Sequence, residues 1–164
     1  MSGLPFNEAL TQLNYFLSCA LNNPIPYIYH QSPTKMETFK AYIIPTLTVN
    51  NAAAALEFYK NAFGAIELMK NVGDDGNIVA EIMIDGARVV VADEAPDHGN
   101  LGPDKQSSIS VRIGLMVTDP DAIAERAIAA GIKVVYPVDD QDYGYRLGHF
   151  IDPFGHHWEI GRPL

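Results

Sequence analysis

The chain has 164 residues, of which 48% are hydrophobic, and a formal net charge of −9 at pH 7. This length suits one domain or two small modules that share a core, and the apolar content is that of an ordinary globular protein. The excess of acids argues against a nucleic-acid partner, because no basic stripe meets phosphates, and the single Cys19 excludes an intrachain disulfide.

The first 40 residues differ from the rest, because no Lys or Arg precedes Lys35. The apolar run 13–21 is similar to a signal peptide or lipoprotein anchor, but it lacks the basic residues that precede such a run. It is also shorter than the roughly 20 apolar residues of a membrane span. We therefore predict an N-terminal extension over residues 1–40 with an amphipathic helix over 7–21, no membrane partner and a cytoplasmic location. A natural start at Met36 is the alternative.

From residue 41 the pattern becomes regular. Asn50 or Asn51 is a good N-cap, a stripe of apolar residues follows, and Gly64 stands where a helix C-terminus needs a left-handed residue. Runs rich in β-branched residues flank this helix, separated by Gly- and Asp-containing turns. These signals predict strands at 41–49, 66–71, 77–84 and 87–93 and a helix at 52–63.

After a linker over 93–107 the same order returns. A strand is predicted at 109–117, and Asp119 with Pro120 then begins a second helix that covers 122–130. A strand at 133–136 follows. The stretch 141–161 predicts a hairpin with the turn Asp152-Pro153-Phe154-Gly155. Pro stands where the turn needs a φ of about −65°, and Gly stands where it needs a positive φ.

The order of predicted elements repeats after about 65 to 70 residues, which indicates an internal duplication. Because each repeat contains one helix and several strands, the sequence predicts an α+β fold. Val49 corresponds to Val117, and the helix end Phe63-Gly64 corresponds to Ala130-Gly131. We predict a domain over 41–164 built from two β-α-β-β-β modules, at about 41–95 and 108–162. Neither module can bury its faces alone, so the two are expected to pair into a curved, half-open mixed sheet around a concave cavity.

Three motifs carry a family resemblance: A-A-L-E-F-Y-K-N-A-F-G-A in the first helix, D-G-A-R-V-V-V-A-D-E at the end of the first module, and D-P-F-G-H-H-W-E-I at the end of the second. The chain resembles the vicinal oxygen chelate superfamily, in its glyoxalase, bleomycin-resistance and dioxygenase group, and is most similar to the PhnB-like members. The resemblance implies the fold and a homodimer. It leaves function open, because the superfamily includes isomerases, dioxygenases, thiol transferases and drug-binding proteins.

Metal enzymes of this superfamily take ligands from the first and last strand of each module. The resemblance places Ile44, Val90, Arg112 and Glu159 at those positions, and only Glu159 is a ligand type. Arg112 is a permanent cation with no acceptor atom. Because a catalytic metal needs about three protein ligands, we expect no cofactor and predict an ion pair between Arg112 and Glu159.

A variant metal site is the alternative, formed by Glu159, His157 and His149. It would make the chain a metal-dependent lyase or dioxygenase, with Glu159 and His157 as the catalytic candidates. A third possibility is a non-metal enzyme in which His157 is a general base beside Glu159. Against these, His149 is interpreted as an ordinary hairpin histidine and Glu81 as a partner of Arg88 or Arg146.

The favoured prediction is a protein that binds a small organic molecule. A flat or cationic ligand is expected, because aromatic side chains stack and attract cations, and because acidic loops attract cations. Trp158 is assigned to the core. The predicted ligand-binding residues share an aromatic, charged or sulfur-containing side chain near the hairpin or the first strands: Arg112, Glu159, Tyr143, Tyr145, Arg146, Tyr42 and Met116.

Overall fold

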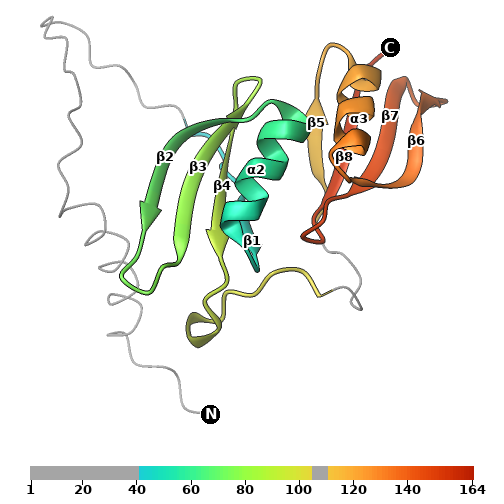
Figure 1. The fold of residues 1–164 in the computed structure, drawn as a ribbon. Coiled ribbons are helices and arrows are strands. Elements are labelled where there is room, and N and C mark those ends of the chain that lie inside the picture. The colour runs from blue at the N-terminus through green and yellow to red at the C-terminus, as the bar shows by residue number, and fades with distance from the viewer. Residues whose placement is uncertain (1–40, 105–110) are drawn as a thin grey trace, which may run out of the picture. The chain divides into compact units, whose positions relative to one another are not determined.

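Two β-α-β-β-β modules make up the part of the chain that the structure describes, which is residues 41–104 and 111–164 of a computed structural model (Figure 1). The predicted extension over 1–40, with its helix at 7–21, lies outside the described residues. So do the first two residues of the strand predicted at 109–117.

Module 1 contains β1 (Thr46–Val49), α2 (Ala52–Phe63), β2 (Ile66–Val72), β3 (Ile78–Ile84) and β4 (Ala87–Asp93). Its sheet has the order β1-β4-β3-β2, in which β1 is parallel to β4 and the other pairs are antiparallel. The first strand is shorter than predicted because Pro45 has no N–H to donate to a ladder. A short 3₁₀ helix, η1 (Pro96–His98), follows the module.

Module 2 contains β5 (Ile113–Met116), α3 (Pro120–Ala129), β6 (Lys133–Gln141), β7 (Tyr145–Ile151) and β8 (His157–Pro163). Its order, β5-β8-β7-β6, repeats that of module 1. Strand β6 runs past its predicted end at Tyr136 and through Pro137, with register shifts on both sides of Tyr136. Proline is tolerated there because β6 is an edge strand.

The helix ends follow the predicted capping residues. The side chain of Asn51 accepts a hydrogen bond from Ala54 N at 2.9 Å, and that of Asp119 accepts one from Ala122 N at 3.1 Å. Gly64 ends α2 with φ 68°, a conformation in which a side chain would be strained. These contacts confirm that short polar residues and one glycine set the helix limits.

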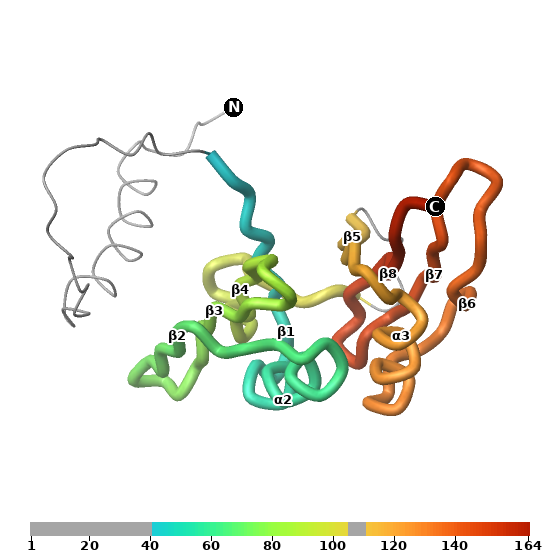
Figure 2. The backbone as a smooth tube through the Cα atoms, turned by 90° about the horizontal axis from the view of Figure 1, so that it is seen from above, coloured from blue at the N-terminus to red at the C-terminus, as the bar shows by residue number. Residues whose placement is uncertain are grey.

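The predicted fold class is confirmed, since the eight strands form two mixed, open sheets of four with one helix for each. In each module the helix packs on one face of its sheet and leaves the other face uncovered by helix (Figure 2). Strand alternation then divides the side chains. On β8, Trp158 and Ile160 are buried, whereas His157 and Glu159 lie on the opposite face.

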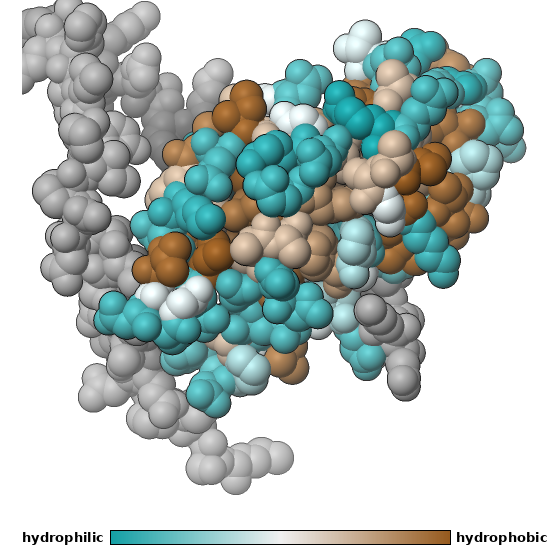
Figure 3. All heavy atoms as spheres, in the orientation of Figure 1, coloured by the Kyte–Doolittle hydropathy of each residue, from teal (hydrophilic) through white to brown (hydrophobic). Residues whose placement is uncertain are grey.

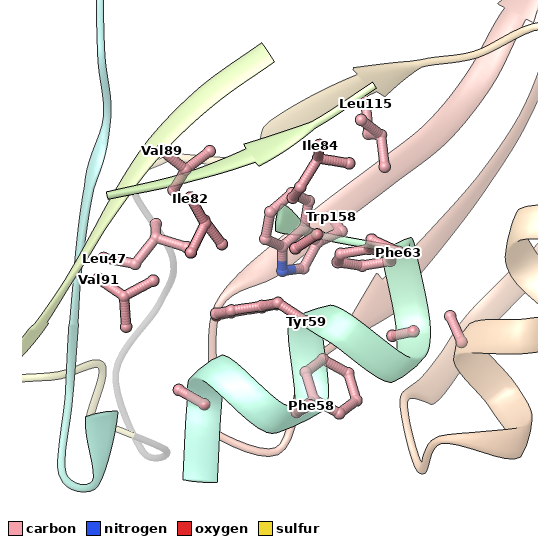
Figure 4. Close-up of a cluster of buried hydrophobic side chains, with 14 of the residues drawn as sticks. Leu47, Phe58, Tyr59, Phe63, Ile82, Ile84, Val89, Val91, Leu115 and Trp158 are labelled. Carbon is pink, nitrogen blue, oxygen red and sulfur yellow. The ribbon is translucent and has the colours of Figure 1, made fainter. Parts of the chain in front are cut away.

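Helix α2 supplies aromatic rings that pack against module 2. Tyr59 and Phe63 point from α2 toward Trp158 (Figure 4), with ring centroids 5.8 and 4.8 Å from that of the indole. Trp158 is only 1% exposed, which confirms its assignment to the core. Aromatic pairs at these separations add to the free energy gained by burial alone.

Asp152, in the turn between β7 and β8, is a buried carboxylate that joins the two modules. It accepts hydrogen bonds from Tyr59 Oη at 2.7 Å and Trp158 Nε1 at 2.9 Å. It also accepts bonds from the backbone N–H groups of Phe154 and His156, at 3.0 and 2.9 Å. Burial, and then the adjacent Asp152 charge, raise the pKa of the Tyr59 hydroxyl, so Tyr59 stays protonated and donates.

The surface carries hydrophilic side chains interrupted by apolar patches (Figure 3). Several large apolar residues are exposed, and Ile66, Leu68 and Val72 of β2 are among them. Within residues 41–104 and 111–164, no helix is long and apolar enough to cross a membrane.

Replacing the buried carboxylate should destabilise the domain strongly. Asp152→Ala leaves several buried donors without an acceptor and should lower the free energy of unfolding by about 3 kcal/mol or more. Tyr59→Phe removes one bond to the carboxylate and should cost about 1.5 kcal/mol. Urea denaturation measures both. Glu57→Gln, which breaks an exposed pair with Lys60 on the same helix, is the control and should change nothing measurable. A Tyr59→Phe protein as stable as the parent would contradict this role for Asp152.

Candidate functional site

The uncovered face of the module 2 sheet carries several polar residues close together. Register places Glu159 of β8 between Gly114 of β5 and His149 of β7. Tyr136 of β6 lies opposite His149 in the next ladder. His157, two residues before Glu159, shares its face. We call this surface the module 2 face and define it by Arg112, Gly114, Tyr136, His149, His157 and Glu159.

Arg112 and Glu159 form the predicted ion pair, with Arg112 Nε 3.2 Å from Glu159 Oε1. The Arg112 side chain is 51% exposed and the Glu159 side chain 24%. Such a partly exposed pair contributes little to stability, because water solvates both charges well. The ion pair is a candidate for function because it lies beside two histidines.

His149 and His157 are in direct contact on this face. Nε2 of His149 lies 2.9 Å from Nδ1 of His157, so one ring donates a hydrogen bond to the other. Burial lowers the pKa of both imidazoles, and Arg112 lowers both further. For His149 the charge of His157 acts in the same direction. Both rings are therefore neutral at pH 7, and each can accept or donate a proton.

Tyr136 closes one side of the histidine pair. Its ring meets that of His149 edge to face, with centroids 5.3 Å apart. Burial raises the pKa of the Tyr136 hydroxyl, and the nearby Glu159 charge raises it further. Tyr136 thus presents a protonated hydroxyl and an aromatic surface beside the charged pair.

Two cavities lie near this face. The larger, about 670 Å³, is bounded by β1, residues 101–104, the start of β5 and the β7–β8 turn. Its walls are mainly apolar, and His157 lies both on this wall and on the module 2 face. The smaller cavity, about 400 Å³, is lined by Tyr42, Arg88 and mostly apolar residues. A ligand at His157 could thus place an apolar body in the larger cavity.

The other predicted ligand-binding residues are not all brought together. Arg146 turns to the helix side, where it donates to Asp121 at 2.7 Å and to Asp140 at 2.8 Å. Tyr143 and Tyr145 contact each other, with ring centroids 6.2 Å apart. Met116 is 48% exposed, and its Cε lies over the Gly114 position. Of the predicted set, Arg112, Glu159 and Met116 share the neighbourhood of Gly114, and Tyr143 lies near enough to Tyr136 to help raise the pKa of its hydroxyl.

Module 1 carries a similar charged pair on its own uncovered face. Arg88 donates to Glu81, and its guanidinium also lies 5.8 Å from the centroid of the Tyr42 ring. This confirms Glu81 as a partner of Arg88. No histidine of the described residues accompanies this pair, since those histidines lie at positions 98, 149, 156 and 157.

The sequence brought His149 and His157 together only in the alternative metal site, and it did not indicate the place of Tyr136. His149 was interpreted as an ordinary hairpin residue, yet it is 7% exposed and paired. A signal was present, because the five residues 152–156 separate Ile151 from His157, which sets these two opposite each other and so brings His149 diagonal to His157. Tyr136 gave no comparable signal, because β6 is irregular on both sides of it.

The chain has relatives of known fold. The model of the Glyoxalase/Bleomycin resistance protein/Dioxygenase superfamily matches residues 41–160. Uncharacterized protein Rv0887c of Mycobacterium tuberculosis is 38% identical over 138 residues, which cover 82% of this chain and 81% of that protein. TioX from Micromonospora sp. ML1 is similar in structure, with a TM-score of 0.58 at 24% identity over 76% of this chain and 100% of that one. The fosfomycin resistance protein FosX from Listeria monocytogenes is also similar in structure, with a TM-score of 0.59 at 16% identity over 77% of this chain and 96% of that one.

The histidine pair should make stability depend on pH. Because both imidazoles have lowered pKa values in the folded protein, the unfolded chain takes up protons first as the pH falls below about 6.5. Their contribution to stability is therefore complete above that pH and is lost on acidification. Melting temperatures between pH 8 and 5.5 should fall less steeply for His149→Phe than for the parent protein. Parallel slopes, after normalisation at pH 8, would contradict the lowered pKa values.

Proposed function

This chain belongs to the glyoxalase/bleomycin resistance protein/dioxygenase superfamily, and from that premise we propose that it binds a small organic molecule at the module 2 face without the usual metal. The observation that carries the proposal is the ion pair between Arg112 and Glu159. A guanidinium lies where the superfamily's pattern would place a metal ligand. The fixed positive charge of the site is then a protein side chain.

The residues at the superfamily's metal positions do not fit a metal ion. Ile44 and Val90 have hydrocarbon side chains, and Arg112 offers donors only. Arg112 would also repel a cation held by Glu159. Within the described ranges, no three His, Cys, Asp or Glu side chains gather in a way that could hold a metal ion. The donor set of this chain thus favours binding that does not depend on a metal.

One observation favours a second candidate, a metal-dependent lyase or dioxygenase with a variant site. His149 and His157 place two ring nitrogens 2.9 Å apart, and both rings are held in the neutral form that ligates metals. Glu159 would be the third ligand, after it leaves Arg112. Catalysis by His157 as a general base, without a metal, uses the same residues.

A homodimer is part of the proposal. Members of this superfamily bind small molecules and often form dimers, and a single module 2 face is open to one side. Its exposed apolar neighbours, such as Met116, would be covered by a second copy. The cytoplasmic location inferred from the sequence stays a prediction.

Arg112→His should increase affinity for divalent metals. The change replaces a permanent cation by an imidazole beside Glu159, His149 and His157 and so completes a ligand set. After dialysis against a chelator, Zn²⁺, Ni²⁺, Mn²⁺ or Fe²⁺ should raise the melting temperature of the variant more than that of the parent. Arg88→His, in the similar pair of module 1, is the matched control and should respond like the parent. A parent protein that one metal already stabilises, with the effect lost in Glu159→Ala, would favour the enzyme instead.

Small-molecule binding can be tested through stability. A compound at 100 times its Kd should add about 2.7 kcal/mol, a shift of several degrees. A library of neutral, cationic and anionic aromatic compounds should contain hits for the parent protein that are lost in Gly114→Leu. A new Cβ at Gly114 would meet only Met116 Cε, at 3.7 Å, so the larger side chain fills the face without disturbing the fold. Hits that Gly114→Leu retains would place binding elsewhere.

A further inference from the structure

We infer that the ligand of the module 2 face carries an anionic oxygen group, such as a carboxylate, which the terminal nitrogens of Arg112 bind. The rest of the ligand is an aromatic or similarly apolar body. This inference rests on the proposed function and names the chemical class of its ligand. It departs from the cationic ligand expected from the acidic loops.

Among the described residues, the guanidinium of Arg112 has a partner on its Nε side only. Its contact with Glu159 is made through Nε, and among the described residues no hydrogen bond to its two terminal nitrogens is found. Arg88 differs, because its Nε faces Glu81 and its Nη1 also donates to Tyr42 Oη at 3.4 Å. The free edge of an arginine matches the two oxygens of a carboxylate or of a tetrahedral oxyanion.

The face leaves room beside this edge. Arg112 immediately precedes β5, and Gly114 follows it by two residues and lies beside Glu159 in the ladder. Because Gly114 has no side chain, the flexible end of Met116 is the group that borders this position, and a Cβ there would meet Met116 Cε at 3.7 Å. Tyr136 borders the same face with an aromatic ring. An anion at Arg112 can thus have an apolar body beside Met116 or Tyr136.

Two positive side chains lie on this side of the sheet although the whole chain is acidic. Arg112 and Lys133 are positive, whereas Glu159 and Asp139, which pairs with Leu147 in the ladder, are negative. Lys133 pairs with Ile151, and Ile151 pairs with His157, so Lys133 lies on the same side of the sheet as His157. The carboxylate of Asp152 is buried and held by four donors. Asp104, on the wall of the larger cavity, adds the remaining negative charge near His157.

The test compares three compounds that share a phenyl body: benzoate, benzamide and benzylamine. Calorimetric titration of the full chain at pH 8, where benzoate is ionised, should show that benzoate binds best of the three. Arg112→Gln should weaken benzoate about tenfold or more, and Gly114→Leu should abolish its binding. Glu159→Gln should strengthen it, because the competing carboxylate is gone.

Arg88→Gln is the matched control and should bind benzoate like the parent protein. Benzoate that binds equally well to Arg112→Gln and to Gly114→Leu would overturn the inference, and so would weaker binding in Glu159→Gln. If benzylamine or benzamide binds in a way that Gly114→Leu blocks, while benzoate does not bind, the proposed function holds and the anionic ligand is wrong. If no compound of the wider library binds either, both are rejected.

Discussion

The carboxylate of Asp152 holds the parts of this domain in place. It lies in the β7–β8 turn, yet two of its donors are Tyr59 of α2 and Trp158 of β8. A buried charge of this kind is tolerated only when donors surround it, and four do so here. The turn is thereby fixed, and the register of β7 on β8 follows from it. That register brings His149, His157 and Glu159 onto one face, so the candidate site depends on a residue that takes no part in it.

The two modules share a fold but not a chemistry. Each places an arginine beside a glutamate on its uncovered face. In module 1 the two residues belong to β4 and β3, and in module 2 the arginine lies just before β5 and the glutamate on β8. In module 1 the arginine is also engaged by Tyr42. In module 2 the pair adjoins two histidines and Tyr136, and a glycine leaves space beside it. The two modules therefore have the same backbone fold, and they differ in the side chains on their uncovered faces.

The proposed site has a guanidinium beside Glu159, and this charge acts differently from a metal ion. A metal ion would polarise a bound group and lower the pKa of bound water, whereas Arg112 offers fixed charge and directed hydrogen bonds. The lowered pKa values of His149 and His157 add a proton acceptor within the same few ångströms. The face is thus suited to holding a charged ligand, and its two histidines change their protonation as the pH falls.

The sequence by itself determined both modules and their helix limits, because caps, turns and strand alternation are local and because the repeat fixes corresponding positions. The pair of Arg112 with Glu159 was predicted from the positions that the family resemblance implies for these residues, and the contact is confirmed. The sequence also placed Trp158 in the core. Tertiary structure alone decided that Asp152 would be buried under Tyr59, that Arg146 would turn to Asp121, and that Tyr136 would lie beside His149. Each of these depends on contacts between segments far apart in the chain or on irregular pairing in β6, and a pattern of neighbouring residues carries no information about which distant side chain fills a given space.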